Sequence, residues 1–443
     1  MKKKQILWFR RDLRVEDSAL LHHTNGEVLP IFIFDKNILD KLPKDDKRVS
    51  FIYKSVLGLK KQLQTIGLDL AIFYGYPKDI FQTLKNGFDE VLCSCDFDAY
   101  ATQRDKEIED ILPLKRFYDS YLIHPSHSLK DDETPYKVFT PFYKNLMPLW
   151  DCSSIEEYQI SQNMSLIDYK FPNTPTLEEL GFQTQLFPKF LEKSGFELLN
   201  EFIPKLENYQ EARDYFYLDG TSKLAVHLRF GLISPKQVFN KIKKYPHSEF
   251  FIRELFWREF YNSILYHFPK SEFENFNGKE ITWNQNKEYF KAWCQGNTGV
   301  PIIDAAMRHL NQTGLMHNRL RMIVASFLTK NLFLPWKWGE EYFAKKLLDY
   351  DASSNIGSWQ WGASTGADSV PYFRVFNPYS QSKKFDKDGI FIKSVIKEFQ
   401  RIEPKLFHIE NGVQSNLFVD YIPIIVNIKN SRVDAIEKFK MLN

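Results

Sequence analysis

Residues 47–75 read KRVSFIYKSVLGLKKQLQTIGLDLAIFYG, and their hydrophobic period changes part-way along. Apolar residues from Val49 to Ile66 recur at steps of three and four, which is the repeat of an amphipathic helix. The segment DLAIFYG (69–75) is then a short apolar run of the length of a buried strand. A helix that leads directly into such a strand is typical of a parallel sheet with crossover helices.

The rest of the first 123 residues repeats this alternation. Four more strand candidates are QILWF (5–9), EVLPIFIF (27–34), EVLCSCDF (90–97) and FYDSYLI (117–123). The pattern predicts an α/β fold, with a doubly wound parallel sheet as an N-terminal domain over residues 1–125. Such sheets often bind nucleotides, but WFRRDLRVED after the first strand contains no GxGxxG, so a standard dinucleotide site is not supported.

The later part of the chain changes character twice. Residues 124–200 carry seven prolines and little periodicity, which predicts an interdomain connection over 126–200. From residue 201 to 443, helical patterns such as PKQVFNKI (235–242) and IDAAMRHL (303–310) dominate. We therefore expect an all-helical second domain.

Composition leaves the function open. The 70 aromatic residues suit a binding pocket for a flat ring, and equally a Phe-rich core. A net charge of +3 does not demand a nucleic-acid partner. Residues 301–330 hold Arg308, Arg319, Arg321 and Lys330 against Asp304, which would suit phosphates or simply be solvated surface.

The cysteines point to a reducing compartment. Cys93, Cys95, Cys152 and Cys294 form no CxxC pair, which argues against a disulfide framework and a zinc site, and we expect no metal. No apolar run approaches the length needed to span a bilayer. The sequence therefore predicts a cytoplasmic protein.

One predicted helix, 250–264, places an acid, an indole and a guanidinium on one face. Glu254, Trp257 and Arg258 stand at i, i+3 and i+4. A carboxylate beside an indole can bind a base edge while the ring stacks. The same spacing also fits a surface Arg–Glu pair above a buried Trp.

Two further segments offer polar groups near helix starts. In MHNRLRMIVASFL (316–328), Asn318, Arg319 and Met322 lie along one side and Arg321 is roughly opposite. GTS (220–222) precedes a helix and suits either a phosphate or a plain helix cap.

The run LLDYDASSNIGSWQWGASTG (347–366) is the most unusual. It combines two acids, a buried-capable amide and two of the nine tryptophans: Asp349, Asp351, Asn355, Trp359 and Trp361. The acids could bind a metal, but no histidine or further acid follows at ligand spacing. They could instead accept hydrogen bonds from a ligand.

Taken together, these segments resemble the photolyase/cryptochrome family, and most closely its class I cyclobutane pyrimidine dimer photolyases. The resemblance covers nearly the whole chain. It is carried by LWFRRDLRVEDSALL (7–21), TPYKVFTPFYK (134–144), DGTSKLAVHLRFGLISP (219–235), ELFWREFY (254–261), WCQGNTGVPIIDAAMRHLNQTGLMHNRLRMIVASFL (293–328) and WQWGASTGADSVPYFRVFNP (359–378).

The resemblance implies that the helical domain binds FAD. The cofactor residues that it implies are Tyr209, Thr221, Ser222, Lys223, Leu224, Ala225, Arg321, Asp349, Tyr350, Asp351 and Asn355. Asn355 matches the residue beside flavin N5, where a neutral amide can accept from an N–H group. Plant-type cryptochromes usually carry Asp there, so Asn355 favours repair over signalling.

The resemblance also implies DNA-contacting residues and an electron relay. The lesion and DNA contacts are Arg213, Glu254, Trp257, Arg258, Tyr261, Asn318, Arg319, Met322, Trp361 and Gln381. Met322 stands where relatives that repair (6-4) lesions carry a His-rich motif, which favours cyclobutane dimers. The relay would run from Trp359 through Trp336 to Trp283.

The implied activity is that of a deoxyribodipyrimidine photo-lyase, in which reduced, anionic FAD passes a light-driven electron to a pyrimidine dimer in DNA. We expect a nucleoid-associated monomer with no membrane partner. The alternative is a blue-light photoreceptor without repair activity, although only about a dozen residues follow the family's closing segment YIPIIVNIKNSR (421–432).

Four departures from the family pattern concern the chromophores. Ala225-Val226 replaces Ser-Pro in the phosphate loop, Tyr350 replaces Gly, and Ile356 and Ser358 depart from the commoner NNGGW. We expect altered packing near the flavin and retained binding. Residues 96–109 lack the Asn-Glu pair of folate-binding members, so a deazaflavin, a flavin or no antenna chromophore all stay open.

Overall fold

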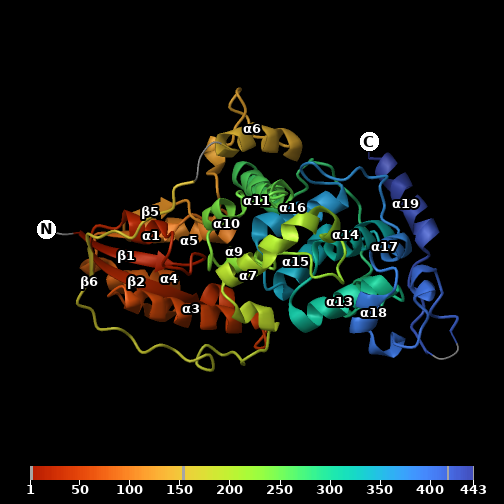
Figure 1. Cartoon of the computed structure of the whole chain (residues 1–443), viewed down its shortest axis with the longest axis horizontal. Helices are drawn as coiled ribbons and strands as arrows, with labels where there is room; N and C mark the ends of the chain where they lie inside the picture. Colours follow the sequence, from red (N-terminus) through yellow and green to blue (C-terminus); the bar gives the residue numbers. More distant parts are fainter. Residues whose placement is uncertain (1–2, 152–154, 417–418, 443) are drawn as a thin grey trace. The chain divides into compact units, whose positions relative to one another are not determined.

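The computed structural model describes the chain apart from residues 1–2, 152–154, 417–418 and 443 (Figure 1). Cys152 therefore lies outside the described residues. Contacts divide the chain into two compact units, Met1–Ile203 with Ser222–Pro269 and Pro204–Thr221 with Lys270–Asn443. The three functional parts predicted from the sequence, divided near residues 125 and 200, stay a prediction.

The first unit is built on a six-stranded sheet in which every pair of strands is parallel. The spatial order is β3 (Ala71–Gly75), β2 (Gly26–Asp35), β1 (Lys3–Phe9), β4 (Glu90–Ser94) and β5 (Leu114–Phe117), and β6 (Met164–Leu166) also pairs with β2. The strand order reverses between β1 and β4, as in doubly wound folds. The predicted parallel α/β fold is confirmed.

Crossover helices connect the strands. Helix α3 (Lys47–Thr65) begins where the Asp46 carboxylate accepts a hydrogen bond from the N–H of Arg48, and it buries the apolar stripe seen in the sequence. The other helices between strands are α1 (Ala19–His23), α2 (Lys36–Leu39), α4 (Pro77–Leu84) and α5 (Ala99–Glu109). Buried residues of α4 and α5 pack on the sheet face that carries Ile6 and Trp8.

Two stretches differ from the prediction. The strand predicted at 117–123 is wrong, because β5 ends at Phe117 and the next residues carry buried polar groups: the Asp119 carboxylate pairs with Arg14 at 2.5 Å. Residues 126–200 also hold more regular structure than predicted, namely β6 and helix α6 (Phe139–Asp151).

Helices dominate from residue 195 onward, a few residues before the predicted start at residue 201. The first unit contains α7 (Gly195–Phe202), α9 (Ala225–Arg229), α10 (Pro235–Ile242) and α11 (Glu249–His267). The second unit contains α8 (Tyr209–Ala212), α12 (Lys287–Gln295), α13 (Pro301–Thr313), α14 (Asn318–Ser326), a π-helical turn (Phe327–Asn331), α15 (Trp336–Lys346), α16 (Ala352–Ala363), α17 (Pro378–Phe385), α18 (Ile390–Val395) and α19 (Ile428–Lys440). Among the described residues, no helix is both long and apolar enough to cross a membrane.

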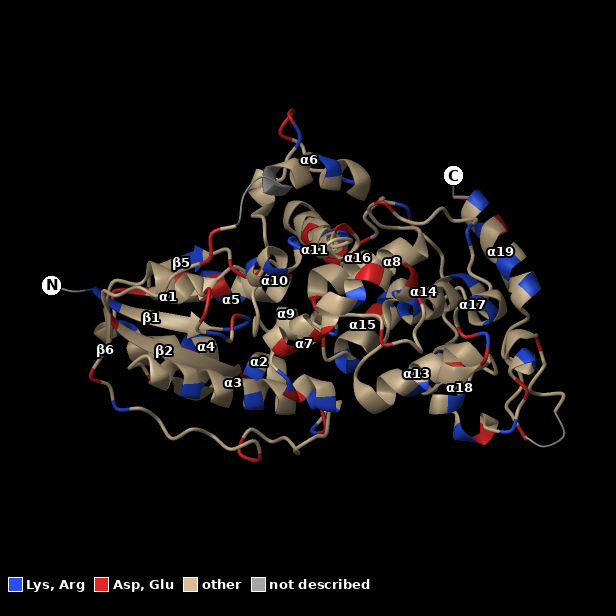
Figure 2. Ribbon diagram, in the orientation of Figure 1, with Lys and Arg blue, Asp and Glu red and all other residues tan. Residues whose placement is uncertain are grey.

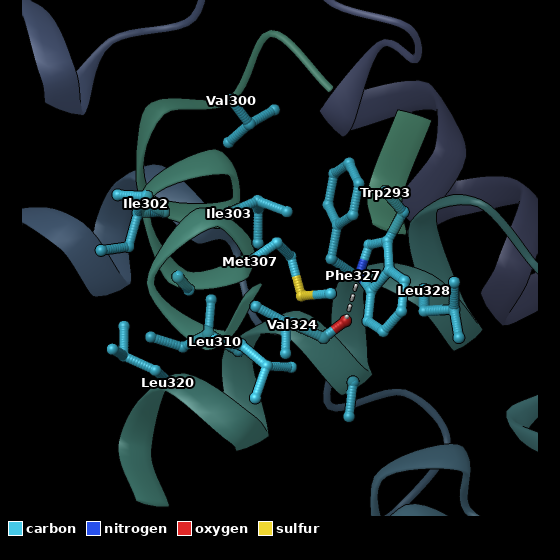
Figure 3. Packing of buried hydrophobic residues seen from close by; sticks show 14 of the residues in the cluster. Trp293, Val300, Ile302, Ile303, Met307, Leu310, Leu320, Val324, Phe327 and Leu328 are labelled. Carbon is cyan, nitrogen blue, oxygen red and sulfur yellow. Dashed lines mark hydrogen bonds between the residues drawn. The ribbon is translucent and has the colours of Figure 1, made fainter. Parts of the chain in front are cut away.

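The core of the second unit is apolar and surrounds Trp293 of α12 (Figure 3). Side chains of α13 and α14, including Ile303, Met307 and Val324, pack beside it. The indole N–H of Trp293 donates to the backbone oxygen of Val324 at 3.2 Å, so its one polar atom is satisfied within the core.

Candidate functional site

The unusual run at 347–366 forms the start and body of α16. The Asp351 side chain caps this helix by accepting from the N–H of Ser354 at 3.1 Å and from the hydroxyl of Ser353 at 2.7 Å. One turn later, Asn355 and Trp359 share a face because they stand at i and i+4. Both are buried. The sequence therefore gives Asn355 a fixed position on a capped helix.

Helix α15 holds the Asn355 side chain in one orientation. The amide nitrogen of Asn355 donates to the carboxylate of Glu340 at 3.0 Å and to its backbone oxygen at 3.2 Å. Tyr350 donates a longer hydrogen bond of 3.4 Å to the same carboxylate. Burial raises the pKa of Glu340, although the bonds from Asn355 and Tyr350 act in the opposite direction.

These two hydrogen bonds from the amide nitrogen, here called the Asn355–Glu340 clamp, leave the amide oxygen of Asn355 as an acceptor. No donor among the described residues meets its Oδ1. An amide oxygen that has no protein donor can accept a hydrogen bond from a ligand N–H group. Glu340 was not predicted as a site residue. Its sequence context, the α15 segment WKWGEEYF, offers two adjacent acids and no motif that distinguishes one of them.

An ion pair connects α14 to the segment before α16. The Arg321 guanidinium donates to both carboxylate oxygens of Asp349, at 2.7 and 3.0 Å, and its Nε donates to the backbone oxygen of Met316 at 2.8 Å. His317 caps the N-terminus of α14, and its Nδ1 accepts from the N–H of Arg319. Burial lowers the pKa of His317 to about 4, which keeps this cap neutral near pH 7.

The lesion-contacting residues predicted on α14 separate into two groups. The amide of Asn318 approaches the sulfur of Met322 at 3.9 Å, so these two share a side as predicted. Arg319 instead pairs with Asp214 at 2.6 Å, and its guanidinium lies 4.6 Å from the centre of the Phe385 ring.

The basic surface considered for residues 301–330 does not form. Arg308 pairs with Glu398 at 3.1 Å, and Arg319 and Arg321 have the acidic partners described above. Lys330 is buried and donates to the Ser364 hydroxyl at 2.8 Å. Figure 2 shows acids and bases interspersed along the chain, in keeping with the small net charge.

The three predicted relay tryptophans lie in the second unit. Trp359 of α16 packs its ring against Gly339 of α15, where any Cβ would collide with the indole, so glycine is required there. Trp336, one turn before Gly339, donates its N–H to the side-chain oxygen of Asn275 at 2.8 Å. Trp336 and Trp283 line one hollow of the surface.

The second unit also holds the predicted residues Tyr209, Arg213, Trp361 and Gln381. The Arg213 guanidinium lies 5.9 Å from the ring centre of buried Tyr209. Trp361 is partly exposed and stands two residues beyond Trp359, hence on the opposite side of α16. The side-chain oxygen of Gln381 is buried and has no hydrogen-bond partner among the described residues.

Helix α11 of the first unit carries the remaining lesion residues. Trp257 is stacked face to face on Phe139 of α6, with ring centres 3.7 Å apart and planes at 7°. Tyr261 packs on Trp257 at 5.6 Å and is buried, and Glu254 is half-buried. The partner Phe139 was missed because it lies 118 positions away in sequence.

Arg258, a predicted DNA contact, has intramolecular partners within the first unit, and its contact with DNA stays a prediction. Its guanidinium donates to the backbone oxygen of Ser120 at 2.7 Å and lies 4.0 Å from the ring centre of Tyr121. It thus holds α11 to the segment after β5.

The loop before α9 includes Thr221 at the end of a segment of the second unit and continues into the first unit from Ser222. Within it, the Ser222 hydroxyl accepts from the N–H of Leu224 at 3.4 Å, and the N-cap of α9 is Leu224, which makes no side-chain cap bond. Lys223 has a left-handed backbone (φ 57°), and its ammonium lies 5.3 Å from the Phe190 ring centre. An ordinary helix cap by Ser222 is therefore not formed. Ala225 is exposed at the start of α9.

Comparison with known proteins identifies the family. The family model described as DNA photolyase matches residues 5–157, and that described as the FAD binding domain of DNA photolyase matches residues 251–441. The deoxyribodipyrimidine photo-lyase of Alkalihalophilus pseudofirmus is 35% identical to this chain over 98% of each. This chain belongs to the DNA photolyase family.

Solved photolyase-family structures share its fold. An archaeal photolyase from Sulfolobus tokodaii, solved with two FAD molecules, is 32% identical and superposes with a TM-score of 0.86 over 99% of this chain and all of that one. A cryptochrome from Synechocystis sp. PCC6803 is 25% identical, with a TM-score of 0.88 over 99% of both chains. The predicted photolyase/cryptochrome fold is confirmed.

Proposed function

We propose that this photolyase-family protein is a DNA-repair enzyme that splits cyclobutane pyrimidine dimers in light, with FAD as its cofactor. The observation that carries the proposal is the clamp on Asn355. Glu340 binds the amide nitrogen, so the neutral carbonyl oxygen is the atom offered to a ligand. A neutral acceptor binds a flavin N–H without placing a second negative charge beside an anionic ring.

The residues present fit FAD. When bound, FAD supplies the light-driven electron transfer, and the chain binds and orients it. Asn355 would hold the flavin N5 edge, and the Arg321–Asp349 pair would fix an acid for polar groups of the ribityl–ribose part. Tyr209, Tyr350, Asp351 and the Thr221–Ala225 loop would complete the site, the loop with its backbone N–H groups toward phosphate.

The substrate groups would act by stacking and hydrogen bonding. Trp257 would contact a base of the dimer, and the stacked Phe139 ring fixes its orientation in advance. Stacking of a base on such an aromatic ring is worth roughly 1–3 kcal/mol. Glu254 would hydrogen-bond the dimer, and Asn318 and Met322 would give an adaptable polar and sulfur contact.

Extrusion of the dimer from the duplex is part of this proposal. A damaged step is poorly stacked, so flipping it costs less than flipping a normal base pair. Tyr261, Arg319, Trp361, Arg213 and Gln381 would line or border the DNA-binding face. The class I assignment, the monomeric state and nucleoid association belong to the same proposal, and so does an antenna chromophore of unassigned identity.

The relay would restore the reduced cofactor. An electron would pass inward from Trp283 at the hollow, through Trp336, which is bonded to Asn275, to Trp359 beside α15. The alternative function is a cryptochrome-type photoreceptor, which the similarity to the Synechocystis cryptochrome keeps in view.

One experiment separates the two functions. Purified protein with reduced FAD is mixed with an oligonucleotide that contains a thymine dimer, illuminated with near-ultraviolet or blue light, and assayed for restored thymines by chromatography. Repair is expected for the wild type and for Lys345→Ala, an exposed position on α15, and a strong loss for Glu254→Ala. No restored thymine in the wild type would contradict the proposal and favour the photoreceptor.

A further inference from the structure

A hollow on the second unit has no role in cofactor or DNA binding as described above. Its volume is about 360 Å³, large enough for a small organic molecule. It is lined by Phe273, Glu274, Asn275, Gly278, Lys279, Glu280, Trp283, Pro335, Trp336 and Lys337. Two of these residues are the last two tryptophans of the proposed relay.

The wall of the hollow is fixed by specific hydrogen bonds. Asn275 accepts from the N–H of Trp336 at 2.8 Å and donates to the backbone oxygen of Lys279 at 2.6 Å. Gln360 of α16 accepts from the N–H of Phe276 at 2.8 Å and donates to the backbone oxygen of Ser271 at 2.7 Å. Gln360 directly follows Trp359. Hydrogen bonds therefore connect the segment 271–279 both to Trp336 and to the residue next to Trp359.

The lining offers aromatic surface together with charge. Trp283 and the 60% exposed ring of Phe273 present flat apolar faces. The Lys337 ammonium donates to the backbone oxygen of Glu272 at 2.5 Å and lies 5.1 Å from the Phe273 ring centre. A planar molecule that carries an ionisable hydroxyl would stack on the rings and meet this ammonium.

We propose that this hollow binds a small, planar one-electron donor of the enediol or phenol class beside Trp283 and Trp336. The inference rests on the proposed relay. The oxidised indole of Trp283 takes one electron and returns to neutral tryptophan. The donor loses that electron, becomes its radical, and releases its hydroxyl proton to water.

The test uses ascorbate as the enediol probe and the FAD-loaded protein. The rate of light-driven reduction of oxidised flavin is measured against ascorbate concentration. A bound donor gives a rate that saturates. A strictly proportional rate up to the solubility limit indicates collision only and would overturn the proposal.

A pair of lysine variants on one helix locates the site. Lys337→Ala removes a cation from the hollow, whereas Lys345→Ala removes an exposed cation two turns further along α15. We expect the half-saturating ascorbate concentration to rise about threefold to tenfold in Lys337→Ala, the scale of one charge-assisted contact of roughly 1 kcal/mol. It should not change in Lys345→Ala, and equal changes in both would overturn the proposal.

Binding in the dark separates this inference from the relay itself. Saturation-transfer NMR of ascorbate is recorded with Trp359→Phe, whose photoreduction the relay proposal expects to be lost. Ascorbate signals that depend on Lys337 support the hollow even if Trp359 proves not to be the relay residue. Absence of those signals in both wild type and Trp359→Phe overturns the hollow and leaves the relay proposal standing.

Discussion

Trp336 and Trp293, two tryptophans of the second unit, have different surroundings. Trp336 shares a face of α15 with Gly339 and Glu340, its N–H donates to Asn275, and it borders the hollow. Trp293 of α12 lies beside Trp359, with ring centres 6.0 Å apart and planes at 72°. Trp293 is fully buried among apolar side chains (Figure 3).

An indole that gives up an electron becomes a cation, which is disfavoured when it is enclosed by apolar side chains. The N–H groups of both indoles have an oxygen acceptor, but Trp336 borders a hollow, whereas Trp293 is enclosed by the core. We therefore propose that Trp336, and not Trp293, would carry charge in the proposed relay, and that Trp293 stabilises the fold.

The largest expected effect is on folding, at Trp293. Trp293→Ala should lower the free energy of unfolding by about 3–5 kcal/mol, because it leaves a large cavity in the core. Trp338→Ala, a partly exposed position on α15, serves as the control and should cost less. Urea unfolding measures both. Photoreduction per folded molecule should be unchanged in Trp293→Ala, and a selective loss of photoreduction there would reverse the comparison.

The next effect concerns light-driven reduction of FAD. Trp336→Phe should slow photoreduction about 100-fold, equivalent to roughly 2.7 kcal/mol, because phenylalanine is much harder to oxidise than tryptophan. Repair by chemically reduced protein should persist. Trp338→Phe, two residues further along the same helix, should photoreduce at the wild-type rate. A normal rate in Trp336→Phe would remove this residue from the relay.

A third prediction concerns the pH dependence of stability. Burial raises the pKa of Glu340 in the folded state, so folding favours its protonated form. The stability that this group contributes is present below its unfolded pKa and is lost as pH rises through the raised folded pKa. Glu340→Gln should therefore lose less stability than wild type between pH 5 and pH 8 in urea titrations. Glu437→Gln, an exposed position on α19, should follow the wild type.

The sequence predicted elements whose signal is local. The stripe from Val49 to Ile66 became α3, and PKQVFNKI became α10 at the predicted residues. The strand at 117–123 failed because a run rich in apolar residues also contains Asp119, whose buried pairing with Arg14 is set by a residue 105 positions earlier. Periodicity cannot report such a partner.

The candidate site shows the same limit. The family resemblance assigned Asn355, Asp349 and Trp359 to the candidate site, because family motifs preserve residue types at fixed spacings. It did not indicate Glu340, which matters only once α15 packs on α16 and its carboxylate meets the Asn355 amide. Nor did it indicate that Arg258, whose residue type suits DNA, donates to the backbone oxygen of Ser120.

The smallest expected effect tests the hydrogen bond between the Trp336 N–H and Asn275. Asn275→Ala removes the acceptor at the Trp336 N–H, while Gln360 still anchors the loop. Losing one hydrogen bond of about 1 kcal/mol to the charged indole should slow photoreduction about threefold to tenfold. Asn277→Ala, in the same loop, is the control because the Asn277 side chain donates to the Ser364 backbone and not to an indole.

We expect Asn275→Asp to change the rate of photoreduction in the opposite direction from Asn275→Ala. This variant therefore distinguishes an effect of charge from an effect of packing. A carboxylate at 275 would stabilise the Trp336 cation more than the neutral amide does, so photoreduction should be at least as fast as in wild type. If Asn275→Asp slowed the reaction as much as Asn275→Ala, Asn275 would act by loop geometry alone. The polar surroundings of Trp336 would then no longer support the proposal that the relay runs from Trp359 to Trp336 and not to Trp293.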